Sequence, residues 1–381
     1  MKTYVEIDTQ NILHNVLEIK KNYAEYKYMI AVLKSGAYGH GEKIVEEVKK
    51  GGADYIAVSY LKEALEIRKY DKDIPLLCLQ PISREDLPIA IKNKITLSIP
   101  SHEYLVNLIS LHMKEPIKLH LQIDSGMGRL GFQNEQDVFT AVNLIKSTEY
   151  LELEGIYTHL ATTGIFDRHY DEQIKRFQKI TSLIDLKEIP MVHISSSVNL
   201  MIHERPSFVN AFRVGILLYG YNVCPTESKV GLKNKLRLAR NNFLRKIWHI
   251  SKTTLNVTLD VKPAMKFITG IIQIKKVEKN TYLGYGATYK VKKDMLVAIL
   301  PVGYANGIRP TKVLIKDKLY PVVGEISMNM MMIQVDEDVK LNDKVIILGD
   351  GITLGAVSRD KHTGIAQTLI EIGNQNERVY K

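Results

Sequence analysis

The feature that most constrains the fold of this chain is an alternation of short apolar runs with amphipathic segments over residues 1–221. The apolar runs, such as KYMIAVLK, DYIAVSY and FRVGILLYG, are nearly uninterrupted, which is typical of strands buried on both faces. The segments between them, such as TQNILHNVLEIKKNY and DEQIKRFQKITSLI, have helical periodicity. About eight such βα units predict a (β/α)8 TIM barrel, with a doubly wound open sheet as the alternative.

The pattern changes near Lys262, where strand-like runs separated by turn residues replace the alternation. Runs such as KVLIKDKLYPVVG and DKVIILGDG are typical of an all-β domain. We therefore expect a barrel over residues 1–227, a basic inserted connection over 228–259 and a mostly β C-terminal domain over 260–381. The first few residues could pair with the C-terminal domain.

The connection over 228–259 contains eight lysines and arginines and no aspartate or glutamate. Leucines, Phe243 and Trp248 are interleaved with these basic residues. Such a composition suits anionic lipid headgroups, and the alternative is a solvated basic linker. We expect a segment that contains a helix and lies near a membrane surface or a membrane-embedded partner domain.

Charge and cysteine content narrow the class of protein. The formal net charge is +10, but no nucleic-acid-binding motif accompanies it, so no nucleic-acid partner is expected. Cys78 and Cys224 have no CxxC spacing, which argues for a reducing compartment and against a metal site. The opening MKTYVEIDTQ lacks the apolar region of a secretory signal. These observations predict a cytoplasmic location.

Several polar groups lie at the carboxyl ends of the predicted strands, where barrel enzymes carry their active sites. They are Lys34, Arg129 in IDSGMGR, His159, Ser195 to Ser197, and Arg213. A lysine desolvated at the mouth of a barrel loses proton affinity and can attack an aldehyde. The usual aldehyde cofactor is pyridoxal 5′-phosphate, and hydroxyls and backbone N–H groups of Tyr38, the serines and Gly215-Ile216 could bind its phosphate.

These residues stand in motifs that resemble those of the alanine racemase family. AVLKSGAYGHG resembles the cofactor-lysine motif of bacterial alanine racemases, and the similarity continues through IDSGMGRLGF, FRVGILLYG, GYGATY, LPVGYANG and PVVGEISMN. The fold of that family is a pyridoxal-phosphate barrel followed by a β domain. The resemblance makes Lys34 the cofactor-binding lysine and one catalytic base, and Tyr285 the base on the opposite face of the substrate.

The resemblance also assigns the remaining site residues. Those expected to bind the cofactor phosphate are Tyr38, Ser196, Ser197, Gly215 and Ile216. His159 would pack against the cofactor ring, and Arg213 would donate to the pyridine nitrogen and keep it unprotonated. The substrate-binding residues would be Arg129, Tyr304, Met328 and Asn374. In a homodimer, Tyr285 and Met328 would complete the partner subunit's site.

Three positions depart from the family pattern. Gln122 stands where the family often has a carbamylated lysine, and its amide oxygen is expected to accept a hydrogen bond from Arg129. Asn329 replaces the aspartate of a Met-Asp pair. Asn374 replaces a tyrosine that crowds the substrate side chain, so the pocket is expected to hold CH2OH as well as CH3. With the basic connection, this pattern looks most like the cytosolic racemase domain of membrane-bound serine/alanine racemases of vancomycin-resistance systems, which follows an N-terminal membrane half.

The sequence therefore predicts a pyridoxal-phosphate-dependent racemase that interconverts L- and D-serine, and alanine, by a two-base mechanism. Its D-serine would supply modified peptidoglycan precursors in glycopeptide resistance, at the inner face of the cell membrane. Two alternatives remain, namely a strict alanine racemase for cell-wall D-alanine and a non-catalytic pyridoxal-phosphate-binding regulatory barrel.

Overall fold

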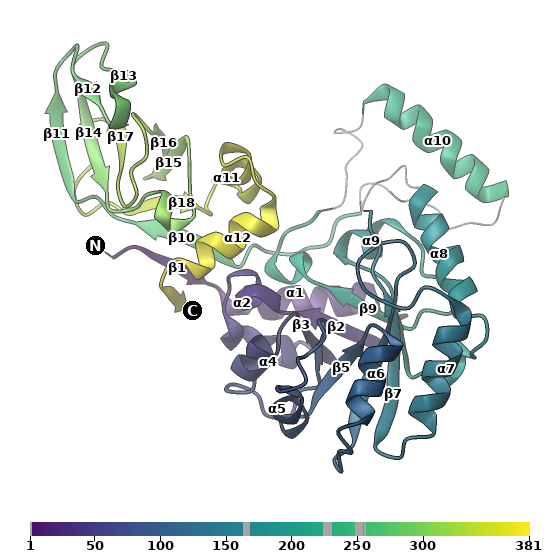
Figure 1. Ribbon diagram of the computed structural model, residues 1–381. Coiled ribbons are helices and arrows are strands. Elements are labelled where there is room, and N and C mark those ends of the chain that lie inside the picture. The colour runs from purple at the N-terminus through teal and green to yellow at the C-terminus, as the bar shows by residue number, and fades with distance from the viewer. Residues whose placement is uncertain (1, 163–167, 224–230, 248–253, 255–256) are drawn as a thin grey trace. The chain divides into compact units, whose positions relative to one another are not determined.

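The computed structural model describes residues 2–162, 168–223, 231–247, 254 and 257–381 (Figure 1). They form two compact units that are not contiguous in the sequence. The barrel unit consists of Leu13–Lys34 and Val45–Lys262. The C-terminal unit consists of Met1–Ile12, Ser35–Ile44 and Pro263–Lys381.

The barrel unit contains a closed barrel of eight parallel strands, β2 to β9 in chain order. Its strands are β2 (Tyr28–Val32), β3 (Tyr55–Val58), β4 (Leu76–Cys78), β5 (Ile95–Ile99), β6 (Ile117–Ile123), β7 (Leu151–Thr158), β8 (Met191–His193) and β9 (Ala211–Val214). Strand β9 pairs with β2 in parallel, with Ala211 opposite Tyr28, and this pairing closes the barrel. The predicted (β/α)8 barrel is confirmed.

Helices connect the barrel strands. They are α3 (Val45–Lys50), α4 (Leu61–Ile67), α5 (Leu87–Lys92), α6 (His102–Ile109), α7 (Glu135–Lys146), α8 (Arg168–Ile180) and α9 (Ser197–Ile202), and α1 (Thr9–Asn22) precedes the first barrel strand. Helix α7 shows why they form. The Asn134 side chain accepts a hydrogen bond from the Asp137 N–H at its start, and Val138, Ala141, Val142 and Ile145 are buried at helical spacing.

The C-terminal unit is mostly β, as predicted. Its six-stranded sheet has the order β16 (Lys318–Pro321), β15 (Lys312–Ile315), β18 (Val345–Leu348), β10 (Met265–Thr269), β1 (Tyr4–Ile7) and β19 (Arg378–Tyr380). A second sheet contains β11 (Gln273–Val277), β14 (Met295–Leu300) and β17 (Met331–Val335), and a third contains β12 (Tyr282–Leu283) and β13 (Tyr289–Lys290). Strand β1 pairs with both β10 and β19, so the first strand of the chain belongs to this unit.

Two helices of this unit, α11 (Leu354–Asp360) and α12 (Ile365–Asn374), were not among the predicted elements. Helix α12 buries Thr368, Leu369 and Ile372 at helical spacing. It packs against the Ser35–Ile44 segment so closely that a Cβ on Gly39 would lie 2.3 Å from the Leu369 carbonyl oxygen. The glycines of KSGAYGHG therefore serve helix packing as well as loop geometry.

Gly373→Ala is expected to destabilise the C-terminal unit, because the new Cβ would lie 1.9 Å from the backbone oxygen of Gly39. Alanine gains about 1 kcal/mol over glycine in a helix, but this backbone clash costs more, so we expect a net loss of roughly 2 kcal/mol in the free energy of unfolding. Chemical denaturation measures this loss. The control is Gly355→Ala in α11, whose Cβ would meet no atom closer than 3.7 Å. Equal stabilities of the two variants would contradict the packing argument.

Within the basic connection, α10 covers Leu232–Ile247, so a helix is present there as expected. Trp248 lies outside the described residues. None of the helices in the described part of the chain combines the length and the apolar character needed to cross a bilayer.

Candidate active site

Lys34 begins α2 (Lys34–Tyr38), just beyond the carboxyl end of β2. The four residues after it have left-handed backbone conformations, with φ values of 56° at Ser35, 64° at Gly36, 50° at Ala37 and 53° at Tyr38. This conformation costs roughly 1–2 kcal/mol for each residue that carries a Cβ. Backbone strain of this kind is concentrated at functional sites, where the surrounding structure must hold it.

The surroundings of Lys34 in the barrel unit make its amine less basic. Burial lowers the pKa of Lys34, and the positive charges of Arg129 and Arg213 lower it further, against an opposing effect of Glu63. A lowered pKa increases the fraction of unprotonated amine at neutral pH. Lys34 is thus suited to act as a nucleophile or a base.

Arg213, on β9, is almost fully buried inside the barrel. Its guanidinium donates to the Thr158 carbonyl oxygen at 2.8 Å and to the His193 Nδ1 at 2.5 Å. Burial lowers the pKa of Arg213 to about 10, so the group remains charged at neutral pH. A buried guanidinium held in this way presents a fixed N–H donor at the carboxyl end of the barrel.

A directed chain of hydrogen bonds leads from Arg213 through the barrel interior to Glu154. Arginine can only donate, so His193 Nδ1 must accept and its Nε2–H then donates to His120 Nδ1 at 2.9 Å. The Nε2–H of His120 in turn faces Glu154 Oε2 at 3.3 Å. Burial lowers the pKa of both histidines, so both are neutral, in agreement with this assignment of tautomers.

Glu154 closes this chain as a carboxylate. Burial alone would raise its pKa, but hydrogen bonds from His120, Lys118 and Tyr55 outweigh that effect and lower the pKa to about 2. The negative charge of Glu154 at one end of the chain thus faces the positive charge of Arg213 at the other. Such buried networks fix the orientation of their members when every member is satisfied.

Glu154→Gln is expected to reduce the free energy of unfolding by roughly 1.5–3 kcal/mol at neutral pH, because the charge-assisted hydrogen bonds are lost. The folded pKa of about 2 lies below the ordinary value of 4.5, so this contribution is fully present above pH 4.5 and is lost as the pH falls toward 2. Thermal unfolding at several pH values should therefore show the wild type and the variant converging in acid. The control is Glu152→Gln, an exposed position on the same strand. A difference that does not depend on pH would contradict the account.

His159 follows β7 and lies beside the same arginine, with its Nδ1 3.4 Å from an Arg213 nitrogen. Burial and the charges of Arg213, Arg129 and Lys34 lower the pKa of His159 to about 3. His159 is therefore neutral, and Arg129, Lys34, Arg213 and His159 lie in one electrostatic environment of the barrel unit. The structure brings together these four residues from separate parts of the sequence.

The candidate phosphate donors of the barrel unit lie around the start of α9 and the end of β9. Ser197 Oγ accepts a hydrogen bond from the Gly215 N–H at 3.0 Å, so its own O–H can donate to a further acceptor. Ser196 Oγ donates to Asn199 Oδ1 at 2.6 Å, which leaves its oxygen as an acceptor in this arrangement. Ile216 begins the short 3-10 helix η3 (Ile216–Tyr219) immediately after Gly215. In the C-terminal unit, burial raises the pKa of the Tyr38 hydroxyl to about 12, so this group is a protonated donor.

The loop after β6 carries Arg129. Burial raises the pKa of Asp124, but the N–H groups of Gly128 and Gly126 donate to its carboxylate and leave the pKa below its ordinary value. The predicted hydrogen bond from Arg129 to Gln122 is not found among the described residues. Instead Gln122 is buried, its Oε1 accepts from Ser98 Oγ at 3.4 Å, and Arg129 is exposed. The reason is that Gln122 points into the barrel, where Ser98 of the neighbouring strand β5 lies.

Asn374, at the end of α12, lies beside the left-handed turn within the C-terminal unit. Its Nδ2 donates to the Ser35 carbonyl oxygen at 3.4 Å, and its Oδ1 accepts from Arg378. Ser35 directly follows Lys34 in the sequence. The amide retains a second N–H and a second lone pair for another partner.

Tyr285, Tyr304 and Met328 lie on loops of the C-terminal unit that contact one another. The Tyr304 N–H donates to the Ser327 carbonyl oxygen at 3.1 Å, so the loops that carry Tyr304 and Met328 are joined through their backbones. A Cβ on Gly284 would lie 2.9 Å from the Glu325 nitrogen, so the loop of Tyr285 packs on the same region. The three side chains are exposed, with relative accessibilities of 72% for Tyr285, 40% for Tyr304 and 55% for Met328.

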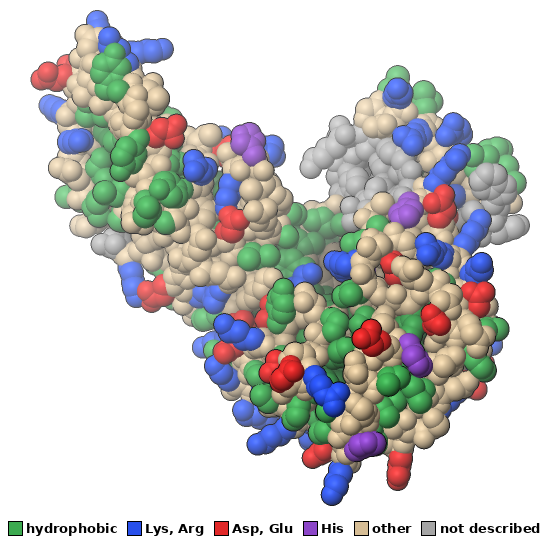
Figure 2. All heavy atoms as spheres, viewed as in Figure 1, with side chains coloured by type: hydrophobic (Ala, Val, Ile, Leu, Met, Phe, Trp, Pro, Cys, Tyr) green, Lys and Arg blue, Asp and Glu red, His purple; other side chains and the backbone are tan. Residues whose placement is uncertain are grey.

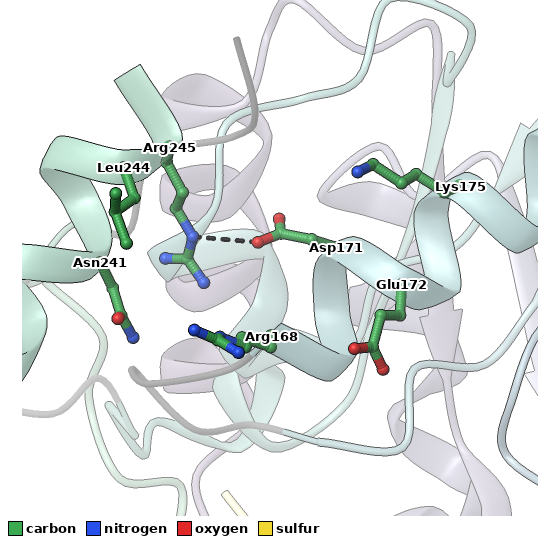
Figure 3. A pocket seen from close by; sticks show the side chains of 7 residues that line it. All are labelled: Arg168, Asp171, Glu172, Lys175, Asn241, Leu244 and Arg245. Carbon is green, nitrogen blue, oxygen red and sulfur yellow. Dashed lines mark hydrogen bonds and ion pairs between the residues drawn. The ribbon is translucent and has the colours of Figure 1, made fainter. Parts of the chain in front are cut away.

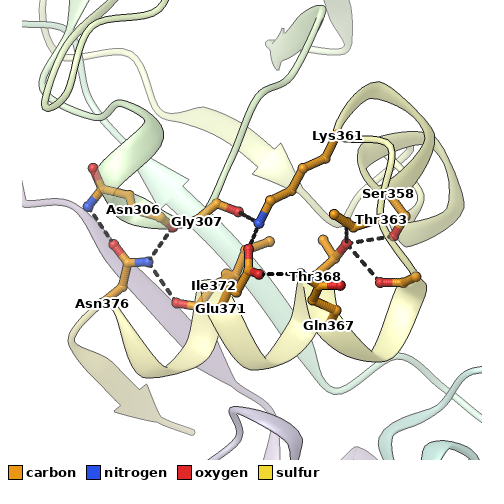
Figure 4. Close-up of polar contacts among 11 residues, drawn as sticks. Asn306, Gly307, Ser358, Lys361, Thr363, Gln367, Thr368, Glu371, Ile372 and Asn376 are labelled. Atoms are coloured by element: carbon orange, nitrogen blue, oxygen red, sulfur yellow. Dashed lines mark hydrogen bonds and ion pairs between the residues drawn. The ribbon is translucent and has the colours of Figure 1, made fainter.

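Polar contacts also join the Tyr304 loop to α12 (Figure 4). Lys361 donates to the Gly307 carbonyl oxygen at 2.8 Å and forms an ion pair with Glu371 on α12. Asn306 donates to Asn376 Oδ1 at 2.8 Å, just beyond the end of the same helix. The loop that carries Tyr304 and the helix that carries Asn374 are thus held in one arrangement.

Each unit by itself carries groups whose chemistry fits pyridoxal phosphate. An aldehyde requires an amine of low basicity, and Lys34 has a lowered pKa. The ring nitrogen accepts hydrogen bonds, and Arg213 can only donate them. The phosphate oxygens accept hydrogen bonds, and the hydroxyls of Ser197 in the barrel unit and Tyr38 in the C-terminal unit can donate them.

His120, His193 and Glu154 were not among the site residues predicted from the sequence. The available signal was polar residues at inward positions of apolar strands, as in IKLHLQ for His120. Inward-facing polar groups in a barrel must find partners on neighbouring strands, which points to a network.

Two family models match almost the whole chain. The alanine racemase N-terminal domain matches residues 7–223, and the alanine racemase C-terminal domain matches residues 264–380. The segment between the two matches includes the basic connection.

Individual relatives and solved structures agree with these matches. An alanine racemase from Streptococcus gordonii is 30% identical over 98% of this chain and 96% of its own length. One from Methanococcus maripaludis is 33% identical over 91% of this chain and 88% of its own length. The structure of the alanine racemase of Clostridium difficile 630 superposes with a TM-score of 0.85 at 30% identity, covering all of this chain and 96% of that one. The structure of the alanine racemase from E. faecalis gives a TM-score of 0.86 at 27% identity, covering 100% of this chain and 98% of that one. This chain therefore belongs to the alanine racemase family, which depends on pyridoxal phosphate.

Proposed function

We propose that this protein interconverts the L- and D-enantiomers of alanine and serine, with Lys34 and Tyr285 as the two acid/base groups. The observation that carries the proposal is the lowered pKa of Lys34 beside Arg129 and Arg213 at the carboxyl end of the barrel. When bound, pyridoxal phosphate withdraws electrons from the Cα–H bond of an amino acid and makes that proton acidic. Racemisation then needs one group on each face of Cα, to remove and to return the proton.

Each candidate residue has a role in this proposal. Lys34 Nζ would hold the cofactor's aldehyde until the amine of the substrate displaces it, and the freed Lys34 amine would then exchange the Cα proton on the face toward the D-enantiomer. The Tyr285 hydroxyl exchanges the proton on the opposite face. Arg213 donates to the ring nitrogen and His159 packs against the ring, and Arg129 attracts the substrate carboxylate. Tyr38, Ser197 and the backbone of Gly215 and Ile216 hold the phosphate, and Ser196 joins them when its hydroxyl turns from Asn199 to the phosphate.

A homodimer would explain the exposure of Tyr285 in one chain. A catalytic tyrosine that is 72% exposed has no site closed around it, and Met328 is similarly exposed at 55%. In the proposed dimer, Tyr285 and Met328 complete the partner subunit's site, and Tyr304 lies beside them. The backbone contacts between the loops of Tyr304 and Met328 support their acting as one surface.

Asn374 is proposed to determine substrate scope. Its amide lies beside Ser35 and retains hydrogen-bonding capacity, so it can pair with a substrate hydroxyl directly or through water. If the protein racemises serine as well as alanine, D-serine would be available for modified peptidoglycan precursors in glycopeptide resistance. The protein would then act at the inner face of the cell membrane, as the racemase part of a membrane-anchored protein. The alternative, a strict alanine racemase, is favoured by the names of its relatives.

Asn374→Tyr is expected to lower serine racemisation preferentially and to keep or raise alanine racemisation. Loss of one hydrogen bond, roughly 0.5–1.5 kcal/mol, changes the preference by about threefold to tenfold, and steric exclusion adds to this change. Chiral chromatography after incubation with L-serine and L-alanine gives the ratio of kcat/KM for the two substrates. Asn374→Ala is the control, because it keeps the space but removes the amide. A parallel fall of both activities in the tyrosine variant, or a wild type inactive on serine, would contradict the assignment.

A further inference from the structure

Helix α10 presents an apolar stripe that no part of the described chain covers. Leu232, Leu236, Phe243 and Ile247 have relative accessibilities of 75%, 66%, 64% and 55%. At about 100° per residue, these four positions and Ala239 fall within about 80° of arc around the helix axis. The stripe therefore forms one continuous face along the helix.

The opposite face of α10 is the one that attaches the helix to the barrel unit. Leu238, Asn241 and Arg245 are its buried residues. Arg245 Nε lies 3.1 Å from Asp171 Oδ2 on α8, and both side chains are largely buried (Figure 3). These contacts hold the helix with its apolar stripe directed away from the barrel.

Basic residues border the apolar stripe on both sides. By helical spacing, Lys233 and Arg240 lie along one edge, and Lys235 and Lys246 lie along the other. The sequence of α10 contains no acidic residue. Lysine, arginine and hydrophobic side chains are visible together over this helix in Figure 2.

We propose that α10 is an interfacial helix that binds this protein to an anionic lipid bilayer through the Leu232, Leu236, Phe243 and Ile247 stripe. Helices that lie in a membrane surface combine an apolar face with flanking Lys and Arg, as here. The apolar side chains enter the headgroup boundary, and the flanking cations contact anionic headgroups, each of which adds to the affinity. A protein partner would need acidic groups to match both edges, whereas an anionic bilayer provides them on all sides of the helix.

Co-sedimentation of the holoenzyme with lipid vesicles tests this proposal. One set of vesicles contains phosphatidylcholine alone, and the other contains roughly one third phosphatidylglycerol. The wild type is expected to partition at least about tenfold more strongly onto the anionic vesicles, and this preference should weaken with added salt. Leu236→Ser combined with Phe243→Ser should lower the partitioning at least about tenfold, with racemase activity unchanged.

A matched control tests whether vesicle binding depends on this face of α10 or on exposed apolar side chains in general. Leu17→Ser combined with Phe139→Ser removes an exposed leucine and phenylalanine from other helices, where they are 52% and 39% accessible. This control should bind like the wild type. The proposal is overturned if the wild type does not bind, binds neutral vesicles equally well, or is unaffected by the α10 variant. It is also overturned if sedimentation velocity without lipid shows self-association that only the α10 variant abolishes, since the stripe would then bind a second copy of the chain.

Discussion

Lys34→Ala is expected to abolish racemisation of both alanine and serine, with a loss of at least about 10³-fold in kcat. The amine of Lys34 is the group whose pKa the burial and the charges of Arg129 and Arg213 lower. Alanine provides neither an amine for the cofactor aldehyde nor a base for the Cα proton. Lys34→Arg should be equally inactive, because a guanidinium keeps the charge but stays protonated.

Borohydride reduction followed by peptide mass spectrometry measures this prediction independently of turnover. In the wild type, the reduced cofactor should be attached to the peptide that contains Lys34. Lys43→Ala, a change at a lysine nine residues further along the chain that lies over the Tyr380 ring, should retain both the label and the activity. Substantial turnover by Lys34→Ala, or a label on another lysine of the wild type, would show that the assignment is wrong.

Tyr285→Phe is expected to lower racemisation by about 10²–10⁴-fold while the cofactor remains bound. The side chain is largely exposed in one chain, so removal of its hydroxyl should change the free energy of unfolding by no more than about 0.5 kcal/mol. Exchange of the Cα proton with deuterated solvent separates the two faces. D-Alanine should still exchange through Lys34, whereas exchange of L-alanine should fall strongly. Equal exchange rates for the two enantiomers would contradict the two-base scheme.

Mixing the two inactive variants tests whether Tyr285 acts across a dimer. In a heterodimer of Lys34→Ala and Tyr285→Phe chains, one of the two sites would contain both native residues. Random association of equal amounts should restore about a quarter of wild-type activity, because half of the dimers are mixed and each has one complete site. No restoration would mean that Lys34 and Tyr285 act within the same chain.

The sequence predicted the barrel well because its strands depend on local patterns. Uninterrupted apolar runs such as that of β3, which buries all four residues, are distinctive without knowledge of their neighbours. Lys34 was identifiable for a related reason, since a charged residue directly after such a run lies at the strand's carboxyl end. The motifs of GYGATY and GYANG likewise stand out in the sequence, and the structure shows that their loops belong to one unit.

The contacts that the sequence did not predict depend on residues far apart in the chain. His120 and His193 are separated by 73 positions in the sequence. Only the closure of the barrel brings His120 Nδ1 to 2.9 Å from His193 Nε2. The partner of Gln122 was predicted incorrectly because the direction of its side chain depends on the barrel register. The close approach of Gly39 and Gly373 could not be predicted, because a glycine in a loop motif does not show which backbone lies against it.

Racemisation by proton exchange at Cα can be followed by incubating the holoenzyme with L-alanine, and separately with L-serine, in deuterated water. Chiral chromatography with mass spectrometry follows both enantiomers and their isotope content. We expect each L-substrate to be converted to nearly equal amounts of the two enantiomers, with one deuterium at Cα of the D-product. Accumulation of a keto acid or an amine, or an L-substrate that is recovered unchanged and without deuterium, would contradict this expectation.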